Sequence, residues 1–368
     1  MEGLAKRLKE MDADALMLVS DSIRDANMFY LTNFLAPDPF FYLGKGESEF
    51  IIVSKMEFSR AKKESRVKDV RSTAEYGLPD LLKKYKDAQK ARSEMLKDVL
   101  NEEGVKRIVV PSNFPFFIAR ELRDFEMVPT RLVEESREVK NKAEIESIKK
   151  AQRACESAMD VAIELVRKAE IDKEFLRLTA EEVKVSIEHE LIKQGCGADD
   201  IIVASGKQAS DPHCSGSGRI EINTPIIIDI FPYLKKERYN ADMTRTVLRG
   251  TPTKEIEEMY RAVCDAQNIA IGKIRAGVTG KEVHEAACDL FRERGYEFVH
   301  STGHGVGLDI HEGPSLAENG NELKVGNVIT VEPGLYDPNI GGVRLEDLVL
   351  VTAKGCKNLT RFPKQLVI

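Results

Sequence analysis

The stretch VITVEPGLYDPNIGGVRLEDLVLVT at residues 328–352 decides what kind of fold this chain can form. It holds two apolar runs that are typical of buried strands. Each run carries a glutamate: Glu332 directly follows 328–331, and Glu346 sits within 343–348. Burying a carboxylate is costly unless the group is paired or bound to a metal. The stretch therefore predicts buried strands with acidic side chains at their ends, each paired with another group or bound to a metal.

Three residues upstream stand in the same kind of context. Asp229 ends a run of three isoleucines, Asp242 precedes MTRT, and His304 lies in the glycine-rich TGHGVG. With Glu332 and Glu346 they make four carboxylates and one imidazole, which is too much negative charge for a single closed zinc site. Such a set suits two adjacent divalent cations that share bridging carboxylates and activate one water.

Four segments that carry these residues resemble one protein family closely. They read NADMTRT (240–246), STGHGVGLDIHEGP (301–314), VITVEPGLY (328–336) and GVRLEDLVLVT (342–352). Their order is similar to that in the pita-bread metallopeptidases, the group that holds methionine aminopeptidase, aminopeptidase P and prolidase. The resemblance is most specific over 200–352 and extends more weakly over the whole chain.

The resemblance implies a fold, a metal centre and a chemistry. The expected fold class is α+β. A C-terminal pita-bread domain, a curved antiparallel sheet backed by helices, would follow a smaller, creatinase-like α/β domain. The implied cofactors are two divalent metal ions, with manganese, cobalt, iron and zinc all left open. The implied metal ligands are Asp229, Asp242, His304, Glu332 and Glu346. Glu332 is also implied as the catalytic group that accepts the proton of the attacking water.

Other histidines are candidates for work at the site. His213 and His311 match histidines found across the peptidase family. They are expected to bind substrate and to act in catalysis by stabilising the oxyanion or protonating the leaving nitrogen. His300 is more typical of the proline-specific branch and is expected to bind substrate. His189 and His284 lie in helical patterns among charged residues and are expected to be solvated.

Arg344 is predicted to support the site from the strand that carries Glu346. Strand alternation places these two side chains on one face, so Arg344 is expected to orient the glutamate, and it is also a candidate for substrate binding. Asp347 points to the other face and is therefore the weaker candidate for a metal ligand. Asp229 and Asp242 are expected to meet across a hairpin, whose loop is longer than is common in the family.

Composition sets the broad class. The chain has 368 residues, of which 42% are hydrophobic and 32% charged, and this is typical of a soluble protein of about two domains. The net charge of −6 argues against nucleic acid as a partner. No apolar run approaches the roughly 20 residues that span a bilayer, so no membrane partner is expected. The six cysteines show no CxxC spacing and are expected to be free thiols in a reducing, cytoplasmic setting.

The predicted domains are 1–133 and 134–368, because a polar segment near 134–140 precedes a long amphipathic helix. In the first domain, a helix opens the chain, strands are expected near 14–19, 50–53 and 108–110, and a helix near 115–125. In the second, helices are expected at 180–194, 253–275 and 279–294, each followed by a C′ glycine at Gly195, Gly277 and Gly295. Strands are expected at 226–231, 244–249, 327–332 and 343–352.

The sequence favours an exopeptidase that removes an N-terminal residue preceding proline, either an Xaa-Pro dipeptidase or an aminopeptidase P. Its substrate would be a dipeptide or a short Xaa-Pro peptide. The added N-terminal domain, His300, and the short connection from Glu332 to Glu346 favour this branch over methionine aminopeptidase. Candidate apolar walls for a proline ring are Phe231, Tyr233, Tyr239 and Tyr336.

Three alternatives stay open at this point. Methionine aminopeptidase is the alternative among peptidases. A creatinase-like hydrolase or an inactive binding module would share the fold, but either would be expected to lack the full ligand set. A homodimer is also expected. It rests on the resemblance and on the aromatic segments 29–30 and 37–42, through which one N-terminal domain would close its neighbour's cleft.

Overall fold

The computed structural model describes residues 3–368. They form two compact units, the first ending at Arg137 and the second comprising Glu138–Ile368. The predicted boundary at 133/134 falls inside helix α7 (Leu132–Glu138). The first two residues of this helix, Leu132 and Val133, are buried in the core of the first unit. Most of α7 therefore belongs to the first unit, although its polar sequence resembles a linker.

The first unit is built on one six-stranded sheet, in the order β4-β3-β2-β1-β5-β6. The strands are β1 (Ala15–Ser20), β2 (Phe40–Lys45), β3 (Ser48–Val53), β4 (Asp69–Ser72), β5 (Arg107–Pro111) and β6 (Glu126–Thr130). Strand β1 pairs antiparallel with β2 and parallel with β5, so the sheet is mixed. The α/β pattern predicted for this domain is thus present, although β2, β4 and β6 were not foreseen.

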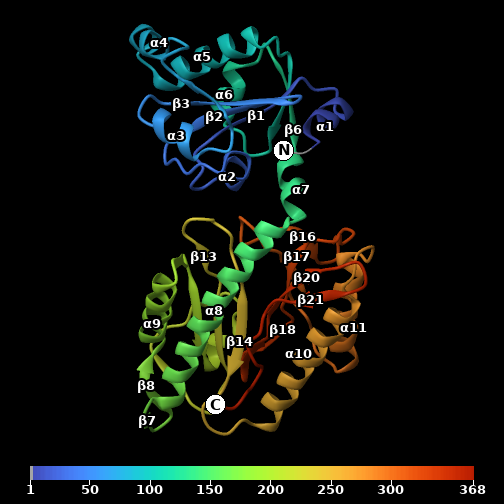
Figure 1. The fold of residues 1–368 in the computed structure, drawn as a ribbon. Coiled ribbons are helices and arrows are strands. Elements are labelled where there is room, and N and C mark those ends of the chain that lie inside the picture. The colour runs from blue at the N-terminus through green and yellow to red at the C-terminus, as the bar shows by residue number, and fades with distance from the viewer. Residues whose placement is uncertain (1–2) are drawn as a thin grey trace. The chain divides into compact units, whose positions relative to one another are not determined.

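Both faces of this sheet are buried. Successive residues of β1 alternate between two separate cores: Leu16 and Leu18 lie in one, and Met17 and Val19 in the other. Helices cover the sheet on either side (Figure 1). They are α1 (Leu4–Glu10), α2 (Ala26–Thr32), α3 (Phe58–Glu64), α4 (Leu78–Tyr85), α5 (Ala88–Glu102) and α6 (Phe116–Glu121).

The aromatic segments that motivated the dimer are core elements. Phe29, Phe40, Phe41 and Tyr42 are each buried inside the first unit. Phe40 and Tyr42 lie in one core and Phe41 in the other, as alternation along β2 requires. These four rings pack inside their own domain, whereas Tyr30 in the same segments is partly exposed and Pro37 and Pro39 are exposed.

The second unit consists of two halves, each with a pair of helices packed against antiparallel strands. In the first half, α8 (Lys142–Lys168) and α9 (Ala180–Lys193) accompany the sheet β10-β12-β14. Asn141 begins α8 with a capping box that Glu144 completes. The half comprises β7 (Ile171–Asp172), β8 (Phe175–Thr179), β9 (Cys196–Gly197), β10 (Ile201–Ser205), η1 (Gly206–Ser210), β11 (Arg219–Glu221), β12 (Ile226–Ile230), β13 (Tyr233–Leu234) and β14 (Met243–Val247).

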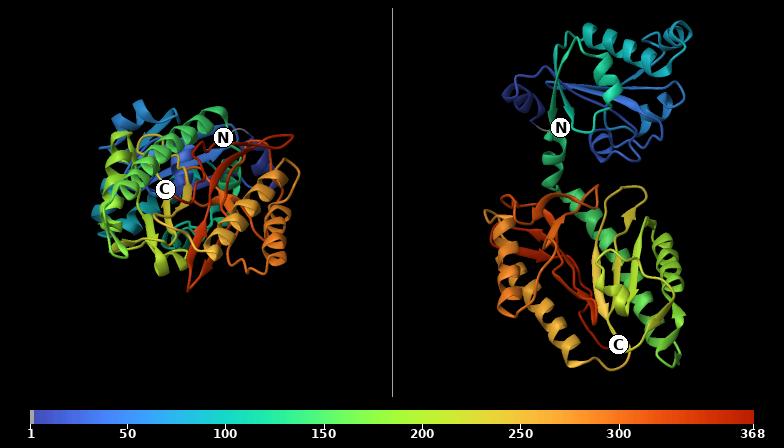
Figure 2. Two further views of the ribbon diagram at one scale, coloured as in Figure 1. Left: turned by 90° about the horizontal axis from the view of Figure 1, so that it is seen from below. Right: turned by 180° about the vertical axis from the view of Figure 1, so that it is seen from behind.

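In the second half, α10 (Lys254–Lys273) and α11 (Gly280–Glu293) accompany the sheet β16-β15-β17-β20-β21. The strands are β15 (Gly303–Gly305), β16 (Glu312–Leu316), β17 (Val328–Val331), β18 (Gly334–Asp337), β19 (Gly341–Arg344), β20 (Asp347–Val351) and β21 (Cys356–Asn358). Seen from behind, α10 and α11 lie along one edge of this unit and α9 along the opposite edge (Figure 2). The α+β prediction is confirmed.

The predicted helices of the second unit are present, with one error in their ends. Gly195 and Gly295 directly follow the cap residues of α9 and α11 and have positive φ, as expected for C′ positions. Gly277 does not: α10 ends at Lys273, and Ile274 after it is extended. Gly277 instead has φ 88° in the turn that leads into α11.

The predicted strand 343–352 is wrong as a single element. Strand β19 pairs with β18, whereas β20 pairs with β17, and Leu345 and Glu346 lie between the two. The Glu346 amide donates instead to the Thr244 carbonyl in the other half of the unit. The chain thus changes partners at Glu346, and this places the glutamate between the halves.

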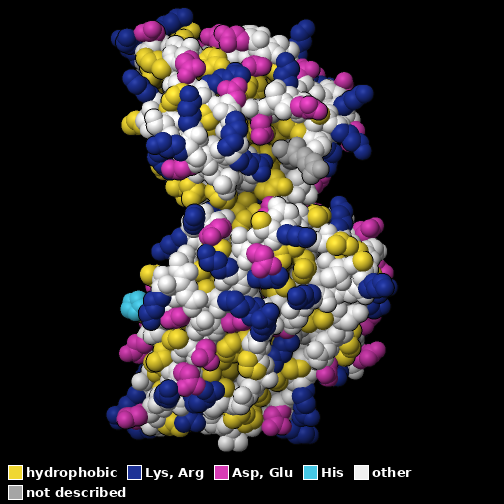
Figure 3. Space-filling view, viewed as in Figure 1, with side chains coloured by type: hydrophobic (Ala, Val, Ile, Leu, Met, Phe, Trp, Pro, Cys, Tyr) yellow, Lys and Arg dark blue, Asp and Glu magenta, His cyan; other side chains and the backbone are white. Residues whose placement is uncertain are grey.

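The surface is of mixed charge. Basic and acidic side chains are interspersed over the face seen in Figure 3. All six cysteines are free, as predicted. No helix in the described chain is long and apolar enough to cross a bilayer.

Candidate metal centre and active site

The first half of the second unit supplies two aspartates from one hairpin. Strands β12 and β14 are antiparallel, and Asp229 lies opposite Thr244. Asp242 directly precedes β14, so the predicted meeting of the two aspartates across a hairpin is confirmed. Asn240, in the connecting loop, donates its side-chain amide to the Gly307 carbonyl at 3.0 Å. The longer loop is thereby tied to the glycine-rich segment of the other half.

The second half supplies the remaining candidates from three chain segments. His304 is the central residue of β15, Glu332 directly follows β17, and Glu346 separates β19 from β20. Strand β15 can approach its neighbours closely because a Cβ on Gly303 or Gly305 would lie within 2.2 Å of a main-chain carbonyl oxygen. These glycines are therefore required by packing, and not only by space around a ligand.

Acidic side chains surround the imidazole of His304. Its Nε2 lies 3.1 Å from Glu332 Oε1 and 3.8 Å from Asp242 Oδ2. One ligand atom each from Asp242, His304 and Glu346 lies within 4.8 Å of the other two. Asp229 and Glu332 lie beside this group. Arg344 donates to one oxygen of Asp229, and His304 lies 3.1 Å from one oxygen of Glu332.

Two buried oxygens indicate what the site is built to hold. Asp229 Oδ1 and Glu346 Oε1 have no hydrogen-bond partner among residues 3–368. An unsatisfied buried carboxylate oxygen is costly in a folded protein. Hard divalent cations are bound by such oxygens together with imidazole nitrogen. The residues present therefore fit divalent metal ions, with Asp229, Asp242, His304, Glu332 and Glu346 as the groups that would hold them.

Ionisation within the cluster reflects crowding of like charges. Burial, followed by the charge of Asp229, raises the pKa of Asp242 well above its usual range. Burial, and next in size the charge of Asp242, raises the pKa of Glu346 well above its usual range. Burial would also raise the pKa of Glu332, but the hydrogen bond and charge of His304 lower it to about 2. The pKa of His304 is lowered by burial but raised by Glu332 and Asp242, to about 9.

Arg344 supports an aspartate and not the glutamate two residues away. Its Nη2 donates to Asp229 Oδ2 at 2.7 Å, and its Nη1 donates to the Tyr336 hydroxyl at 2.9 Å. Glu346 is held by the Thr244 hydroxyl at 2.8 Å. The expectation that Arg344 orients Glu346 is therefore wrong, because it assumed an unbroken strand. Each half of the unit instead positions a carboxylate of the other half.

The remaining residue of this strand behaves as expected. Asp347 is turned away from the cluster and pairs with Arg245 at 2.8 Å and with Lys364 at 2.6 Å. Arg245 is nearly fully buried and is further bound by the main-chain carbonyls of Phe362 and Pro363. This ion pair fixes the C-terminal segment against β14 and leaves no role for Asp347 at the cluster.

The cluster and the three candidate histidines together line a cavity of about 540 Å³. The rings of His311 and His304 are 4.3 Å apart between centroids. His300 is held by two bonds: Nδ1 to the Ser301 carbonyl at 2.8 Å and Nε2 to the Tyr336 hydroxyl at 3.1 Å. Burial lowers the pKa of His300 and of His311. His213 comes from the loop after η1.

The apolar walls are only partly those expected. Phe231 and Tyr336 line the cavity, whereas Tyr233 and Tyr239 are not among its lining residues. Tyr233 instead stacks under Arg238. Further lining residues were not foreseen because they stand alone in irregular segments or at strand starts, where sequence carries no signal. They are Asp200, Ile202, Pro212, Val299, Ser301 and Ile310.

The two helical histidines differ from one another. His189 on α9 is exposed, as predicted. His284 on α11 is only 9% exposed, so the prediction that it is solvated is wrong. Its charged neighbours in sequence lie on the outer face of α11, while His284 shares the inner face with Val283, Ala287 and Phe291.

Comparisons with known proteins agree with this geometry. The model of "Metallopeptidase family M24" matches residues 146–353, and that of "Creatinase/Prolidase N-terminal domain" matches 1–139. An Xaa-Pro dipeptidase of Pyrococcus horikoshii is 31% identical over 100% of this chain and 99% of its own length. A solved Xaa-Pro dipeptidase from Bacillus anthracis has a TM-score of 0.85 at 29% identity, covering 100% of this chain and 98% of its own. An X-Pro aminopeptidase from Thermotoga maritima has a TM-score of 0.81 at 29% identity, covering 98% and 100%.

Proposed function

The chain belongs to metallopeptidase family M24, with a creatinase/prolidase N-terminal domain, and from this premise we propose that it is an Xaa-Pro dipeptidase. The observation that carries the proposal is that four carboxylates and His304 line one cavity together with His213, His300 and His311. The names of the full-length relatives support the choice of proline.

We propose two divalent metal ions, bound by Asp229, Asp242, His304, Glu332 and Glu346. When bound, they would polarise the scissile carbonyl and lower the pKa of the attacking water. Glu332, which lines the cavity, accepts the proton of that water, and its Oε1 is held by His304 and Thr330. The bonds between Arg344 and Asp229 and between Thr244 and Glu346 keep these carboxylates fixed during the reaction.

His213 and His311 act on the substrate. Burial and the neighbouring His304 lower the pKa of His311, so near neutral pH it is mainly uncharged, with one ring nitrogen able to donate a hydrogen bond. Such a donor can stabilise the developing oxyanion or direct a proton to the leaving nitrogen. A proline nitrogen carries no hydrogen in the peptide, so an acid on this side of the cavity is needed.

The apolar part of the cavity suits the proline ring. Phe231 and Tyr336 are its aromatic residues, and Ile202, Val299 and Ile310 add aliphatic surface. His300 is fixed against Tyr336 and presents its ring to the same space. Arg344 reaches the cavity too, but its donors are engaged by Asp229, Tyr336 and Pro212. We therefore propose that Arg344 supports substrate binding indirectly, by holding Asp229 and Tyr336 in place.

One set of assays tests the proposal. The protein, loaded in turn with manganese, cobalt, iron or zinc, is given Ala-Pro, Ala-Pro-Ala, Ala-Ala and Met-Ala at equal concentration. We expect Ala-Pro to be cleaved fastest and Ala-Ala slowly. Faster cleavage of Ala-Pro-Ala would make the protein an aminopeptidase P, and preference for Met-Ala would make it a methionine aminopeptidase. No cleavage at full metal occupancy would favour a creatinase-like hydrolase or a binding role.

We further propose a homodimer in a reducing, cytoplasmic compartment. The six free cysteines support the compartment. The dimer rests on the family resemblance alone, since the aromatic segments lie in the core of the first unit. Sedimentation at micromolar concentration tests it, and a monomer at that concentration would end the proposal.

A further inference from the structure

His284 is a buried titratable residue that the proposed chemistry does not use. It lies on the inner face of α11, outside the cavity, and is 9% exposed. A buried histidine needs partners for its ring nitrogens. Both of its partners lie within the second unit, and one of them leads directly to the metal centre.

The inward partner is Thr302. His284 Nδ1 lies 2.9 Å from Thr302 Oγ1, and the threonine is fully buried. The main-chain carbonyl of Thr302 accepts the Glu332 amide at 2.8 Å. His284 thus holds the residue that fixes the backbone of the proposed proton acceptor.

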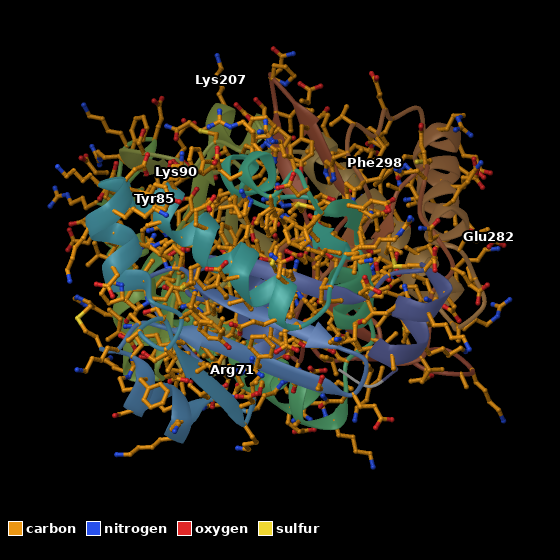
Figure 4. All side chains as sticks on the ribbon, turned by 90° about the horizontal axis from the view of Figure 1, so that it is seen from above. Arg71, Tyr85, Lys90, Lys207, Glu282 and Phe298 are labelled. Carbon is orange, nitrogen blue, oxygen red and sulfur yellow. The ribbon has the colours of Figure 1, made fainter. Side chains whose placement is uncertain are left out.

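A second contact runs through an aromatic ring. The centroid of Phe298 lies 5.6 Å from that of His284 and 4.8 Å from that of His300, in an edge-on arrangement with the latter. Figure 4 labels Phe298 together with Glu282, which marks α11. The ring of Phe298 therefore contacts both His284 on α11 and His300, which lines the cavity.

The outer partner of His284 is a thiol. Cys288 Sγ lies 3.4 Å from His284 Nε2, one helical turn further along α11. A thiol that donates to Nε2 leaves the proton of the neutral ring on Nδ1, which then donates to Thr302. Burial lowers the pKa of His284, in keeping with a neutral ring. The hydrogen bonds of His284 are thus complete without solvent.

Residues 298–302 form neither helix nor strand, yet they carry His300 and lead into β15 with His304. Thr302 is fixed by main-chain bonds, because its amide donates to the Leu316 carbonyl at 2.8 Å and its carbonyl accepts from the Glu332 amide. The residues before it depend more on side-chain contacts such as those of Phe298. We propose that His284 is a positioning residue that clamps this segment at Phe298 and Thr302, and so fixes Glu332 and His300 for the reaction. The inference rests on the proposed function.

Substitution of His284 tests the clamp. His284→Leu removes both ring nitrogens, and we expect kcat for Ala-Pro to fall roughly 10- to 100-fold, because small misplacements of reacting groups cost rates of this order. Metal content should stay near wild type, and KM should rise less than kcat falls, because His300 on the same segment is a proposed substrate-binding residue. His284→Asn places an amide near the position of Nδ1 and should recover most of the rate. His189→Leu, an exposed histidine on α9, is the matched control and should leave kcat unchanged.

A second measurement does not depend on activity. In the metal-free protein, amide hydrogen exchange of residues 298–304 should be faster in His284→Leu than in wild type, with α8 and α9 unaffected. Thr302→Val removes the hydroxyl from the other side of the bond and should have the same two effects, which covers the case that His284→Leu fails to fold. Cys288→Ala tests the contact with His284 Nε2. It should lower kcat less than either His284→Leu or Thr302→Val does.

The results separate the two proposals. Wild-type rates and exchange in both His284→Leu and Thr302→Val would overturn the clamp. A loss of kcat in His284→Leu that His284→Asn does not recover would also overturn it, because the Nδ1 bond would then not be the cause. A metal-loaded wild-type protein that leaves Ala-Pro intact would contradict the dipeptidase proposal, while the exchange data would still report on the clamp.

Discussion

The two units bury polar groups in opposite ways. Among its described residues, the first unit buries one charged side chain, Arg137, at its very end. The second unit buries Asp229, Asp242, Glu346 and Asp347, while two arginines, Arg245 and Arg344, lie among them. The sheet of the first unit has a hydrophobic core on each of its two faces. The second unit accepts crowded like charges at its centre, which costs stability unless cations are bound.

The difference separates residues that stabilise the fold from residues that position the metal centre. A sheet with apolar residues on both faces is stable without any ligand. The second unit instead positions its carboxylates by bonds that cross between its halves, from Arg344 to Asp229 and from Thr244 to Glu346. Substitutions in the second unit should therefore change metal binding and rate, and substitutions in the core of the first should change stability alone.

The largest effect is expected from Asp242→Asn. The amide removes one negative charge and bridges two cations poorly, so we expect activity to be abolished and metal content to fall. Asp242 is buried among like charges, so the metal-free variant should be at least as stable as the metal-free wild type. Metal analysis, peptide assays and thermal unfolding measure these three quantities. A variant with full metal and near-normal turnover would contradict the assignment of Asp242.

A loss of rate without loss of metal is expected from His311→Ala. His311 is near the cluster but outside the ligand set, so the variant should keep its metal while kcat falls about 10²- to 10³-fold. Metal content and kcat are measured on the same preparation. If both fall in parallel, His311 is a ligand and its assigned role is wrong.

A loss of stability alone is expected from Phe41→Ala. Phe41 is buried in one core of the first unit, and truncating a buried phenylalanine typically costs about 3–5 kcal/mol. Denaturant unfolding of the first unit should report this cost. Metal content and kcat at low temperature should be unchanged. Phe116→Ala, which removes an 80% exposed ring from the same unit, is the control. Equal costs for the two would contradict the packing described for this core.

The smallest effect, counted per pH unit, is a dependence of metal affinity on pH. The pKa of His304 is about 9 in the metal-free protein, so at pH 7 its ring carries a proton that a metal must displace. Affinity should therefore rise with pH, about tenfold per pH unit for each proton released, and level off above pH 9. Calorimetry in buffers of different ionisation enthalpy counts the protons. An affinity that is flat between pH 6 and 9 would contradict this ionisation.

Much of the site could be read from residue types and their local context. Asp229, Asp242 and Glu332 each stand at the end of an apolar run, and His304 stands between glycines, so burial and chemistry coincide in the sequence itself. Residues such as Thr244, Thr302 and Tyr336 are ordinary in sequence, and their roles arise from partners 18 to 102 positions away. Local patterns cannot report such contacts.

The errors have the same origin. Arg344 was assigned to Glu346 because the two are close in sequence, but the chain changes strands between them and Arg344 reaches Asp229. His284 was expected in solvent because its neighbours are charged, but the helix turns it inward against Thr302. The division into units follows Arg137, within the polar segment where the sequence placed the boundary, and this segment is helical because a polar helix and a polar linker look alike in sequence.

By itself, the sequence determined the α+β class, the order of the main helices and the candidate ligand set, since these depend on periodicity and on residues whose burial demands a partner. Only the tertiary structure decided which oxygens are already bound by the protein, that each half of the second unit supports the other's carboxylates, and that His284 turns inward to Thr302. Those outcomes depend on which segments pack together, and this is a property of the whole chain's packing and not of any local stretch.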